Sequence, residues 1–339
     1  MDKKRFVLSG YFGFKNFGDE AILSVLVNKL KELNQSVTVI SSNPEYTKSK
    51  FKHIRSIYTF NLRDILGAII KSDYLISGGG SLLQDVTSLK SLIYYLSVIF
   101  FGLLFGKKVI IFAQGIGPIN NGFGKFLTRT LLKHCTYVSV RDEKSLKLLE
   151  SWGIIADLVC DPVFSTKIES AEKTNTVAVQ LRDFKTMNED FIDRLAQKVS
   201  VEFSDKTVEI YSFQDDIDLK ICEAFEKSLK LLNPDIKTVL YSNLSDEQII
   251  SGISKAQYLI AMRFHAIIVG LISSTRTLAI DYDVKVQKIA SEFGLPIIDL
   301  KNDFEDKFSN LKSVNLDNVN ILVKNKSFDW SGFMNTIKE

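Results

Sequence analysis

AQYLIAMRFHAIIVG, residues 256–270, is the stretch from which the fold can be predicted. Its first part is a short apolar segment typical of a buried strand, and its last part is an apolar helix. Arg263 and His265 therefore lie where a strand gives way to a helix. In open α/β sheets, ligands bind outside the carboxyl ends of the strands, and the N–H groups of a following helix attract anions there. We therefore predict a ligand site at this junction.

The side chains at this junction suit an anion and a proton transfer. Arg263 offers a fixed fork of donors for phosphate or carboxylate, and His265 can exchange a proton near neutral pH. The chain has 3 histidines. Since His53 lies in a polar connection and His134 near the end of a basic helix, His265 is the best-placed proton carrier. In the structural alternative, Arg263 pairs with a core carboxylate and His265 is a satisfied buried ring.

Strands and helices alternate in two series on either side of a polar, aperiodic segment at residues 166–176. Such alternation builds parallel sheets from βαβ units. We predict an α/β protein with two Rossmann-like parallel-sheet domains facing a cleft. The domains are predicted at residues 1–165 and 177–300, and a tail at 301–339 is expected to pack back on the first domain.

Glycine-rich turns follow several strands of the first series, at residues 9–20, 78–81 and 113–118. Glycines at such turns let the backbone approach a ligand closely, although the spacing is not that of a dinucleotide fingerprint. Asp19 and Glu20 oppose a bare pyrophosphate, so we favour a sugar or mixed polar ligand. In the second series, Arg182 follows the first strand and should share one sheet edge with Arg263.

Asp281-Tyr282-Asp283 is similar to the D-x-D pattern that holds a divalent metal for sugar nucleotides. The alternative is that these carboxylates form a turn or cap a helix. No His, Cys or carboxylate cluster elsewhere has the spacing of a zinc or iron site. We therefore predict no metal and no cofactor.

Composition limits the partners. The net charge of +3 is too small for bulk nucleic-acid binding. Residues 1–165 hold 21 Lys and Arg against 13 Asp and Glu, whereas residues 166–339 hold 22 against 27. The basic first half could face an anionic substrate or membrane, or be a solvated surface. Three cysteines without metal-ligand spacing, and no secretory apolar region near Met1, predict a cytoplasmic protein.

One uncharged apolar segment spans residues 91–106. It is shorter than the roughly 20 residues that a membrane-spanning helix needs. It is either a buried helix of an α/β layer or, through Leu92–Phe105, a contact with the inner face of the plasma membrane.

Seven motifs together resemble the polysaccharide pyruvyl transferase family, most closely its CsaB-type branch. They run in order from residue 10 to about residue 290 and are GYFGFKNFGDEA (10–21), GGGSLLQD (78–85), AQGIGP (113–118), SVRD (139–142), DP (161–162), MRFH (262–265) and DYDVKV (281–286). Family members often carry proline where Val284 stands. The resemblance implies a glycosyltransferase-B-like architecture.

The resemblance also implies an activity. Enzymes of this type transfer the enolpyruvyl carbons of phosphoenolpyruvate onto two sugar hydroxyls, giving a cyclic ketal and phosphate. The implied acceptor is N-acetylmannosamine of a lipid-linked precursor of a bacterial secondary cell-wall polymer. His265 would be the acid and Asp85, across the cleft, the base. Phosphoenolpyruvate would contact Arg182, Arg263, Phe264 and His265. The predicted acceptor residues are Gly13, Asn16, Asp19, Gly79, Gly80 and Gln114.

Two other functions share these features. A glycosyltransferase that uses a nucleotide sugar would need the same glycine loops, and a non-catalytic protein could bind a sugar or an anion without reaction. The acceptor sugar, the hydroxyls used and the oligomeric state do not follow from the sequence.

Overall fold

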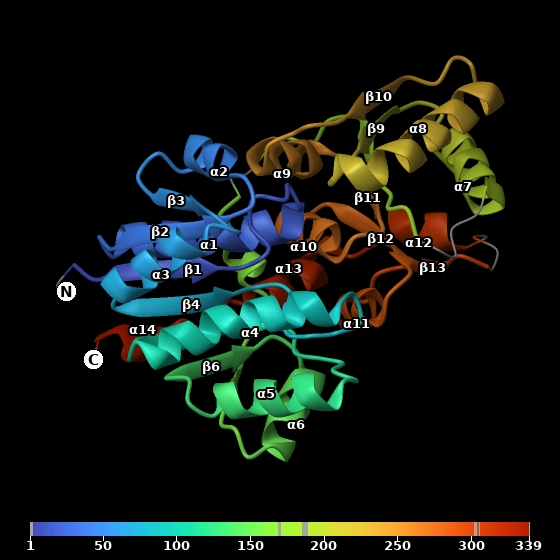
Figure 1. Ribbon diagram of the computed structural model, residues 1–339. Coiled ribbons are helices and arrows are strands. Elements are labelled where there is room, and N and C mark those ends of the chain that lie inside the picture. The colour runs from blue at the N-terminus through green and yellow to red at the C-terminus, as the bar shows by residue number, and fades with distance from the viewer. Residues whose placement is uncertain (1–2, 169–170, 185–188, 302–303, 305, 339) are drawn as a thin grey trace. The chain divides into compact units, whose positions relative to one another are not determined.

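The computed structural model describes residues 3–168, 171–184, 189–301, 304 and 306–338 (Figure 1). The chain forms two compact units. The first unit contains Met1–Ser165 and Ser327–Glu339, and the second contains Thr166–Lys326. Each is an α/β unit around a parallel sheet, as the alternating strands and helices predict.

The first unit holds a seven-stranded parallel sheet in the order β3-β2-β1-β4-β5-β6-β7. Its strands are β1 (Arg5–Ser9), β2 (Ser36–Ser41), β3 (Arg55–Tyr58), β4 (Tyr74–Gly78), β5 (Lys108–Gln114), β6 (Tyr137–Val140) and β7 (Asp157–Leu158). The strand order reverses between β1 and β4, which lie side by side. The loops after these two strands are therefore where an open α/β sheet places its ligand.

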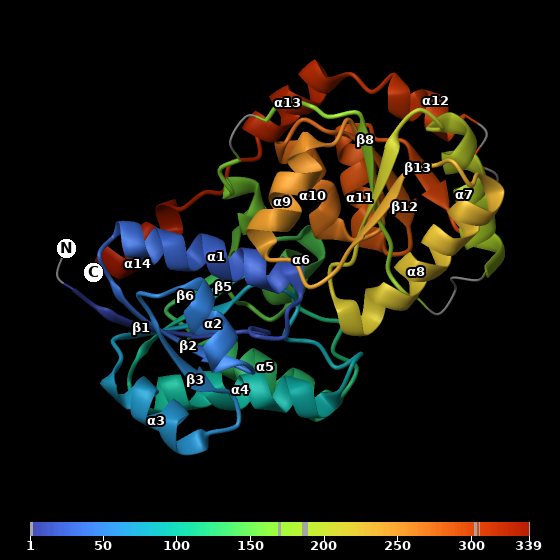
Figure 2. The ribbon, with the colours of Figure 1, turned by 90° about the horizontal axis from the view of Figure 1, so that it is seen from above.

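Helices cover both faces of this sheet, as Figure 2 shows for α1 on one face and for α3 and α4 on the other. The helical segments are α1 (Phe17–Glu32), α2 (Pro44–Lys50), α3 (Leu62–Lys71), α4 (Leu89–Leu104), α5 (Gly122–Leu132), α6 (Glu143–Ser151), the 3₁₀ segment η1 (Pro162–Ser165) and α14 (Ser331–Lys338). Successive strand residues supply both cores, because Phe6 and Leu8 pack with α1, whereas Val7 packs with α3, α4 and α5.

The second unit holds a six-stranded parallel sheet in the order β10-β9-β8-β11-β12-β13. Its strands are β8 (Thr176–Gln180), β9 (Thr207–Tyr211), β10 (Thr238–Tyr241), β11 (Tyr258–Ala261), β12 (Arg276–Asp281) and β13 (Ile297–Asp299). Its helices are α7 (Glu189–Glu202), α8 (Asp215–Leu232), α9 (Asp246–Lys255), α10 (Phe264–Ile272), α11 (Val284–Phe293), α12 (Lys307–Lys312) and α13 (Leu316–Lys324). Here the order reverses between β8 and β11.

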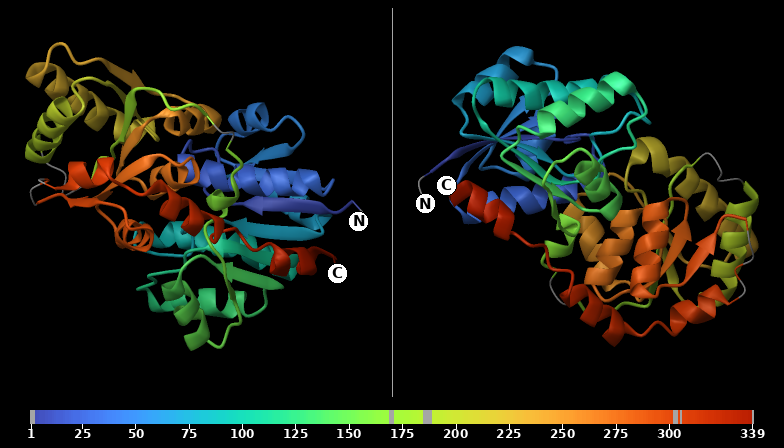
Figure 3. Two further views of the ribbon diagram at one scale, coloured as in Figure 1. Left: turned by 180° about the vertical axis from the view of Figure 1, so that it is seen from behind. Right: turned by 90° about the horizontal axis from the view of Figure 1, so that it is seen from below.

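The predicted tail divides between the two units. Helices α12 and α13 belong to the second unit, because Phe308 and Leu311 complete its core. Of the described tail, residues 327–338 lie with the first unit, where α14 packs near β6 (Figure 3). The ring of Phe333 contacts that of Phe112. Of the predicted tail, residues 302–303, 305 and 339 lie outside the described residues.

Candidate functional site

The predicted anion site lies at the carboxyl edge of the second unit's sheet. Strands β8 and β11 pair in parallel with Gln180 opposite Ala261. Arg182 and Arg263 each follow their strand by two residues, so both start from neighbouring strand ends. Tyr282 follows β12, the next strand on the same edge.

Arg263 is anchored by a carboxylate of its own unit. Its Nε and Nη2 donate to Asp218 Oδ2 and Oδ1 of α8 at 2.8 and 2.7 Å. Its backbone N–H donates to the buried Gln180 Oε1 at 2.7 Å. The side chains of Arg263 and Asp218 are 10% and 0% exposed. The structural alternative for this arginine is therefore confirmed, although its Nη1 makes no hydrogen bond within the described part of the chain.

Burial raises the pKa of the Asp218 carboxyl, and the guanidinium of Arg263 opposes that rise. Arg182 also acts electrostatically on Asp218 in the same direction as Arg263. Two arginines thus share the field of one buried carboxylate, which compensates only one of their charges.

Arg182 makes weaker contacts. Its Nη1 lies 3.5 Å from the Tyr282 hydroxyl, and its guanidinium lies over the Tyr282 ring at 5.6 Å. Its buried Nε donates to no atom among the residues described. Since a buried guanidinium N–H normally has an acceptor, Arg182 retains a donor for an anion.

His265 and Phe264 open helix α10 directly after Arg263. The two rings meet edge to face, with centroids 5.3 Å apart. Both side chains are half-buried. The structure therefore brings Arg182, Arg263, Phe264 and His265 to one edge of one sheet.

The two aspartates of the D-x-D pattern have local partners. Asp283 is the N-cap of α11 and accepts from the N–H of Lys285 at 3.0 Å, whereas Asp281 accepts from Gln287 Nε2 at 2.7 Å. The helix-capping alternative is confirmed for Asp283. Over the described ranges, no group of three or more His, Cys, Asp or Glu side chains could hold a metal ion.

In the first unit, the predicted acceptor residues surround the loops after β1 and β4. Asn16 is the N-cap of α1 and accepts from Gly18 N–H at 3.1 Å. Asp19 of the same helix lies against Gly80, because a Cβ on that glycine would come 2.5 Å from Asp19 Oδ1. Three of the predicted residues, Asn16, Asp19 and Gly80, therefore lie together.

The glycines of these loops make room for the protein's own side chains. A Cβ on Gly79, where φ is +66°, would lie 2.4 Å from Ile22 Cγ2. A Cβ on Gly13, where φ is +82°, would lie 2.2 Å from Ser41 Oγ. The close approach predicted at these glycines is thus made by α1 and the end of β2.

Gln114 at the end of β5 is fully buried. Its Nε2 donates to Ser77 Oγ of β4 at 2.8 Å. Its Oε1 accepts no hydrogen bond from the residues that the structure describes. A buried acceptor in this state is unusual, and it marks the β4–β5 edge as polar.

Asp85, the predicted base, lies in the loop before α4 and holds the loop before α5. Both its oxygens accept from the N–H of Asn120 at 2.9 Å, and Oδ2 also accepts from the N–H of Asn121 at 2.6 Å. These backbone hydrogen bonds lower the pKa of Asp85. A lowered pKa weakens a carboxylate as a base, so this geometry favours a structural role as much as a catalytic one.

Sequence reasoning missed Asp218 and Gln180, which position Arg263. Asp218 is 45 residues from Arg263 and lies on a different helix, so the spacing of residues in the sequence does not predict this ion pair. In the first unit, Arg141 and Asp161 form a buried ion pair at 2.5 Å, and Arg141 Nη2 donates to Ser81 Oγ at 3.3 Å. Arg141 belongs to the SVRD motif and Asp161 to the DP motif, and no other feature of the sequence predicts that these two residues pair.

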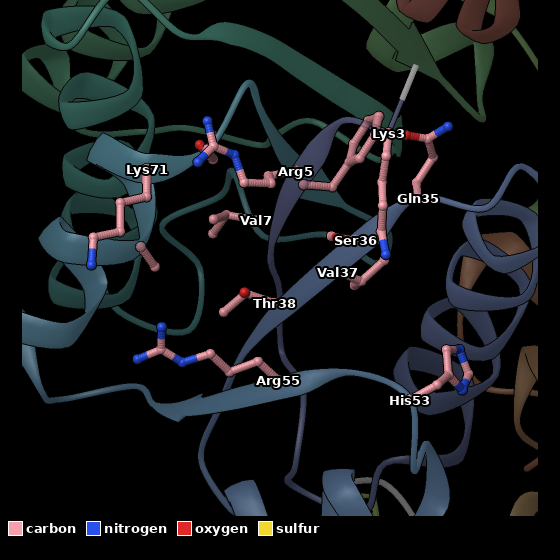
Figure 4. Close-up of a pocket in the computed structure, with 13 residues that line it drawn as sticks. Lys3, Arg5, Val7, Gln35, Ser36, Val37, Thr38, His53, Arg55 and Lys71 are labelled. Atoms are coloured by element: carbon pink, nitrogen blue, oxygen red, sulfur yellow. The ribbon is translucent and has the colours of Figure 1, made fainter. Parts of the chain in front are cut away.

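A pocket of about 400 Å³ lies at the amino ends of β1, β2 and β3 in the first unit. Figure 4 shows the basic side chains that line it, which are Lys3, Arg5, His53, Arg55 and Lys71. Arg5 is paired with Asp73. Since ligands of open α/β sheets bind at the opposite edge, this pocket is separate from the predicted acceptor residues.

Comparison with known proteins finds a family model and several solved structures that match this chain. The model of a family described as polysaccharide pyruvyl transferase matches residues 16–284. No curated protein matches the sequence.

The solved structures that this chain resembles cover nearly its whole length. They include the S. aureus MnaA–UDP co-structure (TM-score 0.64, 12% identity, 100% of this chain and 98% of that one). UDP-GlcNAc 2-epimerase from Methanocaldococcus jannaschii has a TM-score of 0.61 (12% identity, 95% and 98% covered). MurG from Acinetobacter baumannii has a TM-score of 0.53 (12% identity, 99% and 98% covered). These similarities establish the fold and confirm the predicted glycosyltransferase-B-like class.

Proposed function

Because this chain belongs to the polysaccharide pyruvyl transferase family, we propose that it transfers pyruvate from phosphoenolpyruvate onto a sugar. The product is a cyclic ketal, and phosphate is released. The proposed acceptor is N-acetylmannosamine in a lipid-linked precursor of a cell-wall polymer. Arg182, Arg263 and His265 at one sheet edge are the observation that carries this proposal.

Phosphoenolpyruvate carries a carboxylate and a phosphate, so its binding needs cations that are not fully neutralised. The ion pair with Asp218 fixes the plane of the Arg263 guanidinium and leaves Nη1 for one anionic group. Arg182 offers its Nε to the other group. A donor held in place before the ligand arrives loses little entropy on binding.

The proposed chemistry begins with a proton from His265 to the methylene carbon of phosphoenolpyruvate. This step turns the methylene into a methyl group and leaves C2 cationic. A sugar hydroxyl then attacks C2 and gives its proton to a carboxylate, proposed to be Asp85. The C2–O bond to phosphate breaks, and the leaving phosphate takes the proton from the carboxylate. A second hydroxyl then closes the ketal ring and returns a proton to the neutral imidazole of His265. Acid–base help of this kind is worth about 10²–10⁴-fold.

The test uses phosphoenolpyruvate with lipid-linked and aryl-linked amino sugars, and mass spectrometry to detect the ketal. His265→Ala should lower ketal formation by about 10²–10⁴-fold and leave the thermal unfolding curve near that of the wild type. His53→Ala, which changes a histidine of the basic pocket, is the control and should keep full activity. Full activity in His265→Ala would end its assignment as the acid.

A nucleotide-sugar-dependent glycosyltransferase is the second candidate, because the S. aureus structure of the same fold is a complex with UDP. Thermal shift separates the two donors. Phosphoenolpyruvate should raise the melting temperature and UDP-sugars should not. A shift with a UDP-sugar alone would favour the second candidate.

A further inference from the structure

Three helices on one face of the first unit carry apolar side chains on the side away from the sheet. Helices α3, α4 and α5 share one core with the sheet. A helix in such a layer normally presents polar residues outward. Here the exposed apolar residues on the three helices are Leu62, Ile70, Leu89, Phe100, Leu104, Phe123 and Phe126. We call this set the apolar helical face.

Helix α4 contains most of the segment that was predicted to be either a buried helix or a membrane contact. Leu92, Leu96 and Ile99 are fully buried in the core, so the segment is mainly a core helix. Phe100 and Leu104 lie on the opposite side, where Leu104 is 59% exposed. A membrane contact would therefore involve this outer stripe together with its neighbours, and not Leu92–Phe105 as a whole.

Helix α5 extends the same surface. Phe123 and Phe126 are 64% and 65% exposed. A Cβ on Gly124, between them, would lie 3.0 Å from Leu92 and 3.4 Å from Leu89, so α5 packs closely on the start of α4. On the other side, Lys107 Nζ donates to the carbonyl of Ile70 at the end of α3. The three helices that carry the apolar helical face therefore pack side by side, α3 against α4 and α4 against α5.

The charges on α4, on α5 and on the segments next to them all have one sign, whereas α3 also carries Asp64. Between Asp85 and Asp142 the sequence contains no Asp or Glu. The same stretch contains seven cations, which are Lys90, Lys107, Lys108, Lys125, Arg129, Lys133 and Arg141. Lys90, Lys125 and Arg129 are exposed beside the apolar residues. Apolar side chains bordered by cations complement an anionic lipid surface.

We propose that the apolar helical face docks on the surface of a membrane that contains anionic lipid. Exposed aromatic and leucine side chains enter the headgroup boundary, and the neighbouring lysines and arginines pair with lipid phosphates. This inference rests on the proposed function in one respect, since a lipid-linked acceptor would be presented at such a surface. Among the helices built from described residues, none is long and apolar enough to cross a membrane.

A second copy of this chain fits the face less well. Two identical faces would bring Lys90, Lys125 and Arg129 of each copy together without carboxylates on α4 or α5 to pair with them. The one carboxylate on α3, Asp64, already accepts a hydrogen bond from Asn61 Nδ2 at 2.8 Å. Like charges brought together at an interface are unfavourable. The charge pattern therefore selects an anionic partner.

The test is co-sedimentation with vesicles of phosphatidylcholine alone or with added phosphatidylglycerol. The wild type should bind only the anionic vesicles, and added salt should weaken the binding. Phe123→Ser/Phe126→Ser should bind at least about tenfold more weakly, because two large apolar side chains are then no longer buried in the headgroup boundary. Lys125→Glu/Arg129→Glu should lose binding as well.

Matched controls come from the second unit. Val201→Ser/Leu231→Ser removes two exposed apolar residues, and Lys220→Glu/Lys227→Glu reverses two exposed lysines. Both should bind as the wild type does. The proposal is overturned if the wild type ignores anionic vesicles, if it binds neutral vesicles equally, or if the controls lose as much binding. A wild-type dimer that Phe123→Ser/Phe126→Ser converts to monomer, without vesicle binding, would also overturn it.

These outcomes are separate from those for the enzyme activity, because the vesicles contain neither phosphoenolpyruvate nor sugar. Vesicle binding without ketal formation on any acceptor would contradict the proposed function and leave the docking surface intact. Ketal formation on a water-soluble aryl-linked sugar without vesicle binding would contradict only the docking surface.

Discussion

Arg182 and Arg263 lie at the same sheet edge but differ in what they already contact. Arg263 holds a buried carboxylate, whereas Arg182 contacts an aromatic ring. Arg263→Ala would leave Asp218 buried and unpaired, so we expect it to lower the free energy of unfolding by about 3–5 kcal/mol. Arg182→Ala should lower the free energy of unfolding by about 1 kcal/mol or less. Its main effect should be on binding, and it should raise KM for phosphoenolpyruvate more than KM for the acceptor. Urea unfolding and two saturation curves measure these effects.

The double variant Arg263→Ala/Asp218→Asn is the control for the buried charge. It should be more stable than Arg263→Ala alone, since no carboxylate is then left without its partner. Wild-type stability in Arg263→Ala would contradict the anchoring role of the ion pair.

The buried thiol of Cys222, near Asp218, should make the stability of the protein depend on pH. Burial, with the nearby Asp218 charge, raises the pKa of its thiol to about 12. In the unfolded chain the thiol ionises near pH 8.5, so between these values the unfolded state binds fewer protons than the folded state. The stabilising contribution is complete below the unfolded pKa and is lost as pH rises toward the folded pKa.

We therefore expect the free energy of unfolding of the wild type to fall more steeply than that of Cys222→Ala above pH 9. The difference in slope should be about 1 kcal/mol per pH unit. Urea titrations at several pH values between 8.5 and 10.5 measure it. Parallel curves for the two proteins would refute the contribution of this thiol.

At the scale of elements, the junction between β4 and α1 depends on one glycine. Gly79 and Gly106 have nearly equal φ angles of +66° and +64°. A Cβ on Gly79 meets Ile22 of α1, whereas one on Gly106 meets nothing within 4 Å. In both alanine variants, backbone strain should lower the free energy of unfolding by about 1–2 kcal/mol. In Gly79→Ala, overpacking should lower it by a further 1–3 kcal/mol, roughly.

Thermal unfolding of the two variants gives the comparison, with Gly106→Ala as the control. Equal losses of stability in the two variants would mean that α1 shifts to accommodate the added methyl group. The close packing of α1 on Gly79 would then not contribute to stability.

The sequence predicted most elements because their signals are local. The apolar runs of β1, β4, β5, β8 and β11 are each bounded by polar or glycine-rich residues. Strands β3 and β13 and helix α2 were missed. Arg55–Tyr58 is short and mostly polar, and α2 is polar apart from Tyr46, although Asn43 before Pro44 is a start signal that could have been used.

The site was only partly predictable for the opposite reason. Strand ends fix which residues reach a sheet edge, so Arg182, Arg263 and His265 could be placed together. What each side chain contacts depends on distant residues. Asp218 reaches Arg263 from another helix, and Asn120 and Asn121 reach Asp85 from another loop. The distance between the partners along the sequence predicts neither of these contacts.

At the scale of the whole molecule, the chain returns to its first unit at the end. Phe328, Phe333 and Ile337 are buried there, and Tyr74 of β4 donates to the carbonyl of Thr336 at 3.3 Å. Three buried side chains at about 1.5–3 kcal/mol each are comparable with the stability of a whole domain. A chain that stops after Lys326 should therefore lose the first unit's cooperative unfolding and keep that of the second.

Hydrogen exchange read by mass spectrometry tests this at peptide level. In the shortened chain, peptides from β5 should exchange much faster, whereas peptides from β11 should stay protected. Full-length Ile321→Ser, which changes an exposed residue of α13, is the control. Unchanged protection of β5 would show that α14 adds little.

The late return of the chain also sets an order for biosynthesis. A ribosome that has finished residue 165 must make about 161 further residues, Thr166–Lys326, before the segment that completes the first unit emerges. At roughly 5–20 residues per second, that interval lasts on the order of 10–30 s. During this time the nascent first unit exposes Phe112 and its neighbours. A chaperone that binds apolar surface could cover them until the segment after Lys326 is made and packs there.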